Sequence, residues 1–193
     1  MVDNNKQKRD EIRATIKQQR KALNDNELQV AATALLSNCS PYLSNVKTVA
    51  GYQAMLGEIP LNPIFQHCQQ HGITTLLPIM CGESLMFAPF DATTTFITKK
   101  YGIREPDIDK SEWLSPRELE LVLVPLVAFD KTCNRIGMGG GFYDRSFEFR
   151  QSSAAPPLLI GAAHALQEVD EVHAQSWDVS LDFVATDMHV LSK

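Results

Sequence analysis

The chain has 193 residues, 44% of them hydrophobic and 21% charged, so it is long enough and apolar enough to bury a core. Its formal net charge of -5 argues against a general nucleic-acid binder, which usually carries a basic excess. The charged N-terminus cannot form the apolar core of a signal peptide, and the most apolar stretch, residues 119–129, is too short to cross a bilayer. We therefore expect a cytoplasmic protein without nucleic-acid or membrane partners.

The first forty residues carry a helical pattern. Residues 6–23 lack glycine and proline and place apolar residues at helical spacing. Asn24 followed by Glu27 resembles a capping box, which predicts a second helical start, and Pro41 is expected to end that helix. We predict a kinked helix or a pair of helices here.

The same segment carries more cations than solubility requires. They are Lys8, Arg9, Arg13, Lys17, Arg20 and Lys21. On the residues alone, a solvated basic face is the favoured interpretation, and a basic site for an anionic ligand is the alternative.

After Pro41 the hydrophobic period changes from helical to extended. A helix is expected over residues 60–71, and residues 91–117 are polar and turn-rich, which predicts a surface excursion. Strands are expected at 46–53, 73–80, 84–89, 119–124, 158–163 and 182–186. Strands alternating with helices predict an α/β fold with a central mixed, mostly parallel sheet flanked by helices.

Sulfur and imidazole groups show no metal-site pattern. The cysteines have no C-x-x-C pair, which favours free thiols over a zinc site or a disulfide framework; they are Cys39, Cys68, Cys81 and Cys133. His67 and His71 have the spacing of a helical zinc site but lack the adjacent glutamate, so solvated histidines are favoured.

A glycine cluster follows the strand expected at 119–124. Its members are Gly137, Gly139, Gly140 and Gly141. Successive backbone amides in such a run can form an anion-binding nest, and a helix is expected to begin at Phe142. The pattern matches neither a Walker loop nor G-x-G-x-x-G. A flexible turn is the alternative, but Arg135 before the run and Tyr143-Asp144 after it favour anion binding.

Two carboxylates lie beside expected turns. Asp144 is expected at a helix start near the glycines, where an ionised carboxylate would suit Mg²⁺; a simple N-cap role is equally open. Glu58 follows the first expected strand, where it is either a charge near the start of the next helix or a carboxylate that orients a polar substrate. No G-x-S-x-G elbow supports a nucleophilic hydrolase.

The run Leu121-Val-Leu-Val-Pro-Leu-Val-Ala-Phe-Asp130, continued by Asn134-Arg-Ile-Gly-Met-Gly-Gly-Gly-Phe-Tyr-Asp-Arg145, closely resembles the 5-formyltetrahydrofolate cyclo-ligase family. The resemblance extends over nearly the whole chain. It implies one domain over residues 1–193, similar to the ribose-phosphate isomerase and CoA-transferase group, with the basic segment 1–40 packed on the α/β core. We expect a monomer.

The resemblance implies an ATP- and Mg²⁺-dependent ligase that closes 5-formyltetrahydrofolate to 5,10-methenyltetrahydrofolate and releases ADP and phosphate. The reaction would pass through a phosphorylated formyl oxygen. A non-catalytic nucleotide- or folate-binding protein on the same fold is the alternative, and a sugar-phosphate isomerase is disfavoured by the N-terminal arginines and the Phe142-Tyr143-Asp144 segment.

The family's functional positions fall on particular residues of this chain. The expected ATP-binding residues are Arg9, Arg13, Arg135, Ile136, Gly137, Met138, Gly139, Gly140, Gly141, Phe142 and Tyr143. The expected substrate-binding residues are Gln53, Glu58 and Tyr143, and the expected magnesium ligands are Asp144 and Asp178.

The resemblance also revises the interpretation of the basic helix. Because Arg9 and Arg13 are four residues apart, they are expected to face the same phosphates, which replaces the solvated-face interpretation for this pair. Some family members carry basic residues where this chain has Met138 and Gly140. The loop is therefore expected to contribute amides, while the cations come from Arg9, Arg13, Arg135, Arg145 and the metal.

Overall fold

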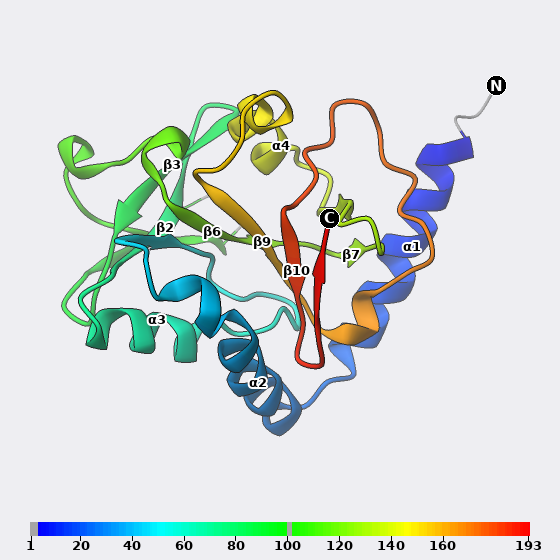
Figure 1. The fold of residues 1–193 in the computed structure, drawn as a ribbon, viewed down its shortest axis with the longest axis horizontal. Coiled ribbons are helices and arrows are strands. Elements are labelled where there is room, and N and C mark those ends of the chain that lie inside the picture. The colour runs from blue at the N-terminus through cyan, green and yellow to red at the C-terminus, as the bar shows by residue number, and fades with distance from the viewer. Residues whose placement is uncertain (1–3, 100–101) are drawn as a thin grey trace.

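The computed structural model describes residues 4–99 and 102–193, and a seven-stranded sheet forms its centre (Figure 1). The strand order is β11-β10-β9-β6-β1-β2-β3. The bounds are β1 Thr48–Ala50, β2 Thr74–Cys81, β3 Ser84–Pro89, β6 Leu121–Pro125, β9 Leu158–Ala162, β10 Phe183–Ala185 and β11 Val190–Ser192. The pairs from β2 to β10 are parallel and both edge pairs are antiparallel, which confirms the predicted mixed, mostly parallel α/β sheet.

Alternation along the central strands divides the core between the two faces of the sheet. Leu121 and Leu123 of β6 pack with α2 (Asp25–Leu43) and α3 (Asn62–Gln70). Val122 and Val124 pack on the opposite face, with residues that include Phe147. A strand buried on both faces is continuously apolar, which is why the run around 119–124 could be recognised.

The N-terminal segment forms a helical pair, α1 (Asn4–Lys21) and α2. The capping box is confirmed, since the Asn24 side chain accepts from the Glu27 amide at 3.0 Å and Glu27 accepts from the Asn24 amide at 2.8 Å. The expectation that Pro41 ends the helix is wrong, because α2 continues to Leu43. The Ser37 carbonyl, which Pro41 cannot serve for lack of an N–H, accepts from the Ser40 hydroxyl at 2.9 Å.

The remaining elements are short. Residues 91–117 carry a two-stranded sheet, β4 (Phe96–Thr98) with β5 (Arg104–Pro106); the residues 100–101 of this excursion lie outside the described part. The expectation that the glycines follow β6 directly is wrong. β7 (Ala128–Phe129) and β8 (Arg135–Ile136) lie between them and form a second small sheet. α4 (Phe142–Ser146) follows the glycines, and 3₁₀ turns lie at 110–112, 116–118, 148–151 and 165–167.

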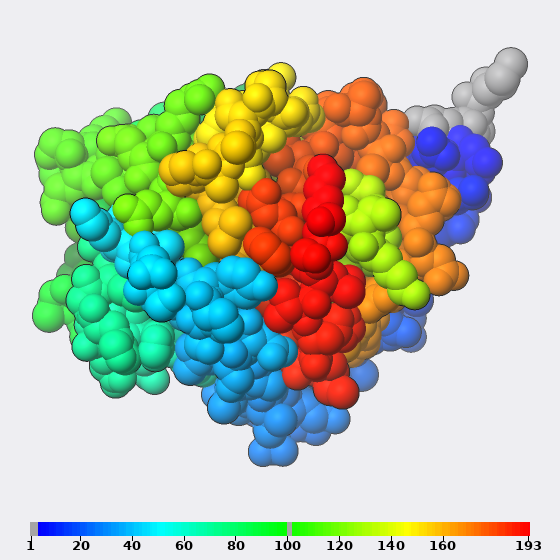
Figure 2. Space-filling model, in the orientation of Figure 1, coloured from blue at the N-terminus to red at the C-terminus, as the bar shows by residue number. Residues whose placement is uncertain are grey.

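The C-terminal part of the chain covers the N-terminal helix. In the space-filling view, residues around 165–180 lie between α1 and the last strands (Figure 2). α1 contacts β7 and the 3₁₀ turn Ala165–Gln167, and its Ile16 packs with Val127 and Val172. No helix among residues 4–99 and 102–193 is long and apolar enough to cross a membrane.

Candidate active site

One face of α1 carries three arginines that reach three distant segments. Arg9 Nη1 donates to Asp178 Oδ2 at 2.5 Å, and Arg13 Nε donates to the Gly137 carbonyl at 2.9 Å. Arg20 Nη1 donates to the Leu126 carbonyl at 3.2 Å. Spacings of four and seven residues place all three on the same helix face. The interpretation of these arginines as a merely solvated basic face is therefore wrong. For Arg9 and Arg13 this agrees with the revised interpretation that followed from the family resemblance.

The glycine loop, residues 137–141, connects β8 to α4. Gly139 and Gly141 have φ values of 98° and 68°, which side chains rarely adopt, and a Cβ on Gly141 would lie 2.5 Å from Arg145 Nη1. Within the described part of the chain, the amides of residues 138–141 donate no hydrogen bond. These amides are available to an anion. α4 has little more than one turn, so its dipole adds little.

Arg145 supports the loop instead of facing it as a free cation. Its Nη2 donates to the Gly140 carbonyl at 2.8 Å and its Nε donates to the Glu83 carbonyl at 2.7 Å. The guanidinium also lies over the Phe142 ring, 5.3 Å from its centroid. The loop is thus tied to the turn between β2 and β3.

The two expected magnesium ligands are linked through the backbone, because Asp144 accepts from the amide of the residue that follows Asp178. Asp144 Oδ1 accepts from Arg135 Nη2 at 2.7 Å and from the Val179 amide at 3.1 Å. Asp178, the residue before Val179, accepts from Arg9 and from the Gln175 amide at 2.9 Å. Each carboxylate is thus paired with an arginine. The N-cap alternative for Asp144 is wrong, because Gly141 is the N-cap of α4.

The two carboxylates suit a magnesium ion that keeps waters and phosphate oxygens as ligands, rather than a metal enclosed entirely by protein ligands. Among the described residues, no group of three or more His, Cys, Asp or Glu side chains could hold a metal. Mg²⁺ commonly takes one or two protein carboxylates and fills its octahedron with waters and phosphate oxygens. Asp144 and Asp178 supply that number of hard oxygen ligands, and a guanidinium stands beside each where a cation would be attracted.

We call Arg9, Arg13, Arg135, Asp144, Asp178 and the glycine loop the loop cluster. Its other predicted members differ in exposure. Met138 is exposed, and Phe142 is partly buried. Ile136 is fully buried beside Val127, so its side chain is directed into the core and only its backbone can contribute to a ligand site.

A second group of polar side chains, buried or partly buried, lies near the end of β1. Glu58 Oε2 accepts from the Met55 amide at 3.0 Å, and its Oε1 lies 4.0 Å from Arg20 Nη1. The Tyr52 hydroxyl donates to the Ile59 carbonyl at 3.1 Å. The Tyr143 hydroxyl is buried and has no hydrogen-bond partner among the described residues. We call Arg20, Tyr52, Glu58 and Tyr143 the Glu58 cluster.

Burial governs the electrostatics of the Glu58 cluster. It raises the pKa of Glu58, and the Met55 amide and the Arg20 charge oppose this shift only in part. It also raises the pKa of Tyr143 and of Tyr52, and the Glu58 charge adds to both shifts. Glu58 therefore lies close to both tyrosines. It does not cap α3, which has Leu61 as its N-cap and no side-chain cap.

Gln53 is half-buried one residue after Tyr52, so the expected substrate residues all lie near the end of β1 or the start of α4. Sequence reasoning missed Tyr52 and the pairing of Arg20 with Glu58. The helical phase that Arg20 shares with Arg13 was the available signal.

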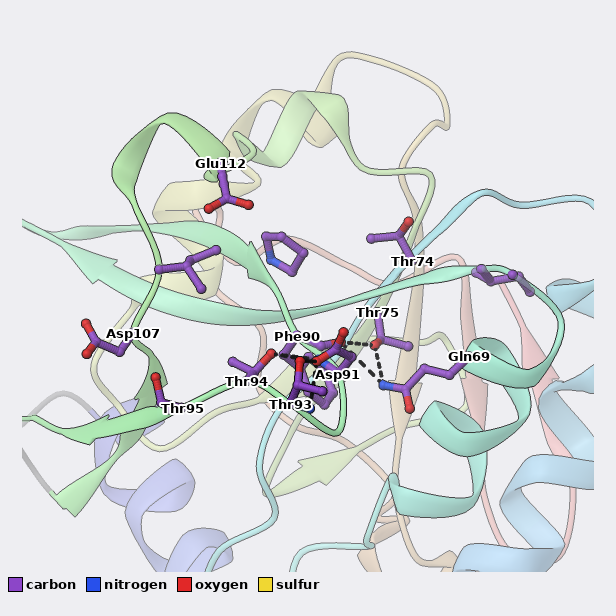
Figure 3. Close-up of a pocket in the computed structure, with 14 residues that line it drawn as sticks. Gln69, Thr74, Thr75, Phe90, Asp91, Thr93, Thr94, Thr95, Asp107 and Glu112 are labelled. Atoms are coloured by element: carbon purple, nitrogen blue, oxygen red, sulfur yellow. Dashed lines mark hydrogen bonds between the residues drawn. The ribbon is translucent and has the colours of Figure 1, made fainter.

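A cavity of about 590 Å³ is lined by residues that belong to neither cluster, among them Gln69, Thr75 and Phe90 (Figure 3). Gln69 Nε2 donates to Thr75 Oγ1 at 2.8 Å, and Thr75 Oγ1 donates to the Phe90 carbonyl at 2.8 Å. The cavity lies where β2 begins, whereas ligands of parallel sheets collect at the carboxyl ends of strands. None of the predicted site residues lines it.

Comparison with known proteins identifies the family. Residues 5–187 match the model of the 5-formyltetrahydrofolate cyclo-ligase family. The 5-formyltetrahydrofolate cyclo-ligase of Escherichia coli (strain K12) is 31% identical over 178 residues, which cover 89% of this chain and 96% of that protein. The enzyme of the same name from Haemophilus influenzae is 31% identical over 182 residues, which cover 92% and 96%.

Solved structures agree with this assignment. The NMR structure of Aquifex aeolicus 5,10-methenyltetrahydrofolate synthetase is similar with a TM-score of 0.81 and 26% identity, over 95% of this chain and 92% of that one. The 5,10-methenyltetrahydrofolate synthetase of Mycoplasma pneumoniae, at 23% identity and a TM-score of 0.73 over 93% and 98%, shares the fold. The chain belongs to the 5-formyltetrahydrofolate cyclo-ligase family.

Proposed function

We propose that this protein is an ATP-dependent ligase that converts 5-formyltetrahydrofolate to 5,10-methenyltetrahydrofolate and releases ADP and phosphate. Family membership supports the activity. The observation that carries it in the structure is the position of Tyr143. This residue follows the glycine loop directly, and its buried, unpartnered hydroxyl lies near Glu58. A phosphate site and a polar organic site therefore adjoin.

The chemistry explains why both sites are needed. The formyl group on N5 is amide-like and has no leaving group, so N10 cannot displace its oxygen directly. Transfer of the γ-phosphoryl group forms an O–P bond to the formyl oxygen and breaks the bond to ADP. N10 then attacks the formyl carbon and loses its proton, and the C–O bond breaks as phosphate leaves. Alignment of the reactants in such a step can contribute roughly 7–11 kcal/mol.

The loop cluster is proposed to bind the triphosphate. The free amides of residues 138–141 would contact phosphate oxygens, and Arg13 already lies against the Gly137 carbonyl. Arg9 and Arg135 would add positive charge where negative charge develops during phosphoryl transfer. Because Met138 and Gly140 are uncharged, these arginines supply the cations that the loop lacks.

We propose that Asp144 and Asp178 hold Mg²⁺ together with phosphate oxygens. When bound, the ion would neutralise phosphate charge and orient the γ-phosphate. Asp144 and Asp178 now accept from Arg135 and Arg9, so these pairs must open or be shared with the metal complex.

The Glu58 cluster is proposed to bind the folate. A carboxylate that is largely removed from water, such as Glu58, suits the N–H groups of a pterin ring, because charge-assisted hydrogen bonds are strong where water is excluded. Glu58 would accept from the ring, Tyr143 would donate to a substrate oxygen, and Gln53 would contact its edge. We also propose that the enzyme acts as a monomer in the cytoplasm.

Absorbance of the methenyl product tests the proposal. A new signal is expected when 5-formyltetrahydrofolate, ATP and Mg²⁺ are supplied together. No signal with all three, or an undiminished signal without ATP, contradicts it. A non-catalytic binding protein would instead bind either compound in calorimetry and convert neither.

A further inference from the structure

Arg20 is a guanidinium enclosed by the protein. The residue is only 1% exposed, and beyond its contact with the Leu126 carbonyl its Nε and Nη2 have no hydrogen-bond partner among the described residues. A buried charge with unpaired donors is costly unless a counter-ion lies near. Its ion-pair partner is Glu58, whose side chain is 14% exposed and 4.0 Å away.

The turn that carries Glu58 rests on the backbone of Arg20 as well as on its side chain. Leu56 and Gly57 have positive φ values of 51° and 75°, and the Glu58 amide donates back to the Met55 carbonyl at 3.0 Å. A Cβ on Gly57 would lie 2.5 Å from the Arg20 carbonyl oxygen. Glycine thus permits contact between this turn and the last turn of α1.

The two contacts of the Glu58 carboxylate leave one oxygen available. Met55 holds Oε2 through its amide, and Arg20 lies on the side of Oε1 at a distance too long for a direct hydrogen bond. Arg20 therefore attracts the carboxylate without saturating Oε1, which is left to accept a hydrogen from a ligand.

We propose that Arg20 is a positioning residue for the folate site: it orients the Glu58 carboxylate toward the substrate without contacting the substrate itself. The proposal rests on the proposed function of Glu58. Because Arg13 touches the glycine loop and Arg20 pairs with Glu58, α1 also sets the spacing of the two sites. Seven residues of helix correspond to about 10 Å along its axis.

Several groups face Glu58 or its partner and bear on its titration. The Tyr52 and Tyr143 hydroxyls are neutral, since burial raises the pKa of both. His164, whose ring nitrogen lies 3.2 Å from the Gly57 carbonyl, is held neutral because burial lowers its pKa. Arg20 is thus the permanent charge that favours ionised Glu58. Its removal should raise the pKa of Glu58 further and move the acid limb of folate kcat/KM to higher pH.

The test compares Arg20→Gln and Arg20→Lys with Lys21→Gln, which removes an exposed charge from the adjacent position. We expect Arg20→Gln to raise the folate KM about tenfold or more with the ATP KM within about twofold, and to shift the acid limb upward. Arg20→Lys should restore part of the loss because it keeps the charge. Lys21→Gln should change neither constant.

A double-mutant cycle decides whether Arg20 acts through Glu58. In a Glu58→Gln background, Arg20→Gln should add little to the folate KM. The pH profile of the double variant should show no acid limb. An equal rise in both KM values, or an undiminished effect in that background, overturns the proposal.

The double variant removes both buried charges, so it keeps the test available if Arg20→Gln alone fails to fold. If the unmodified protein shows no turnover, the proposed function is contradicted. This outcome is therefore distinct from a failure of the Arg20 proposal.

Discussion

The loop cluster and the Glu58 cluster lie at neighbouring places in the fold but are built in different ways. The first combines loop amides that donate no hydrogen bond to any described residue with two arginine–carboxylate pairs, in which Asp144 is 21% exposed. The second is built around Arg20, whose side chain is 0% exposed, and the buried Tyr143 hydroxyl. Phosphates and a hydrated metal require adjustable, partly hydrated partners, whereas a pterin ring is recognised by fixed, dehydrated ones. Substitutions in the two clusters should therefore affect different substrates.

Asp144→Asn should give the largest change that is specific to ATP. It removes charge from a proposed magnesium ligand and from the partner of Arg135, so kcat/KM for ATP should fall roughly 100-fold. Folate binding, measured by calorimetry without nucleotide, should remain nearly unchanged. Equal losses for both substrates would break the division between the clusters.

Glu58→Gln should give the matching change on the folate side. Loss of a charge-assisted hydrogen bond costs about 1.5–3 kcal/mol, or roughly 10- to 150-fold in folate kcat/KM. Because burial raises the pKa of Glu58, the unmodified enzyme should lose folate affinity as the pH falls through that raised value. The variant should lack this acid limb. If the pH profile of the Glu58→Gln variant keeps the acid limb, another group is responsible for the titration.

Gly141→Ala tests the conformation of the glycine loop, with Gly72→Ala as its matched control. Both glycines have positive φ, 68° and 71°, so both variants should lose about 1 kcal/mol of stability in thermal unfolding. A Cβ at Gly72 meets nothing within 4 Å, whereas one at Gly141 meets Arg145. Only Gly141→Ala should raise the ATP KM, by about tenfold. An equal rise of the ATP KM in both variants would mean that the effect comes from general backbone strain and not from the loop.

Tyr143→Phe should give the smallest kinetic effect and the clearest separation of stability from binding. The hydroxyl is buried without a partner, so its removal should leave the melting temperature unchanged or slightly higher. The folate KM should rise about fivefold if the hydroxyl donates to the substrate, by the loss of one neutral hydrogen bond. A lower melting temperature with an unchanged KM would make it a structural group.

Local patterns account for the parts of the fold that could be predicted. The capping box at Asn24 and Glu27 depends on residues three apart, and the strand around 119–124 is apolar because both of its faces are covered. The end of α2 was misjudged, since a hydroxyl one residue before Pro41 replaces the missing donor. The short β7–β8 pair also escaped prediction, because two-residue strands carry no periodicity.

The residues of the loop cluster could be named from sequence because the glycine run and its flanking charges are contiguous, and because the family resemblance covers distant positions. Their contacts could not. Asp144 contacts the Val179 amide, next to Asp178, because the chain segment before β10 returns to α4, and each carboxylate pairs with an arginine there. From the sequence alone, Arg20 is interpreted as a solvated helix charge. The structure shows instead that the turn carrying Glu58 packs against it.

By itself, the sequence determined the α/β architecture, the conformational freedom of the glycine loop and the kinds of chemical group available. These depend on neighbours along the chain and on hydrophobic periodicity. Only the tertiary structure decided which arginine faces which carboxylate and how far each carboxylate is removed from solvent. Burial, and with it the pKa of Glu58, depends on elements that are distant in the chain and adjacent only after packing.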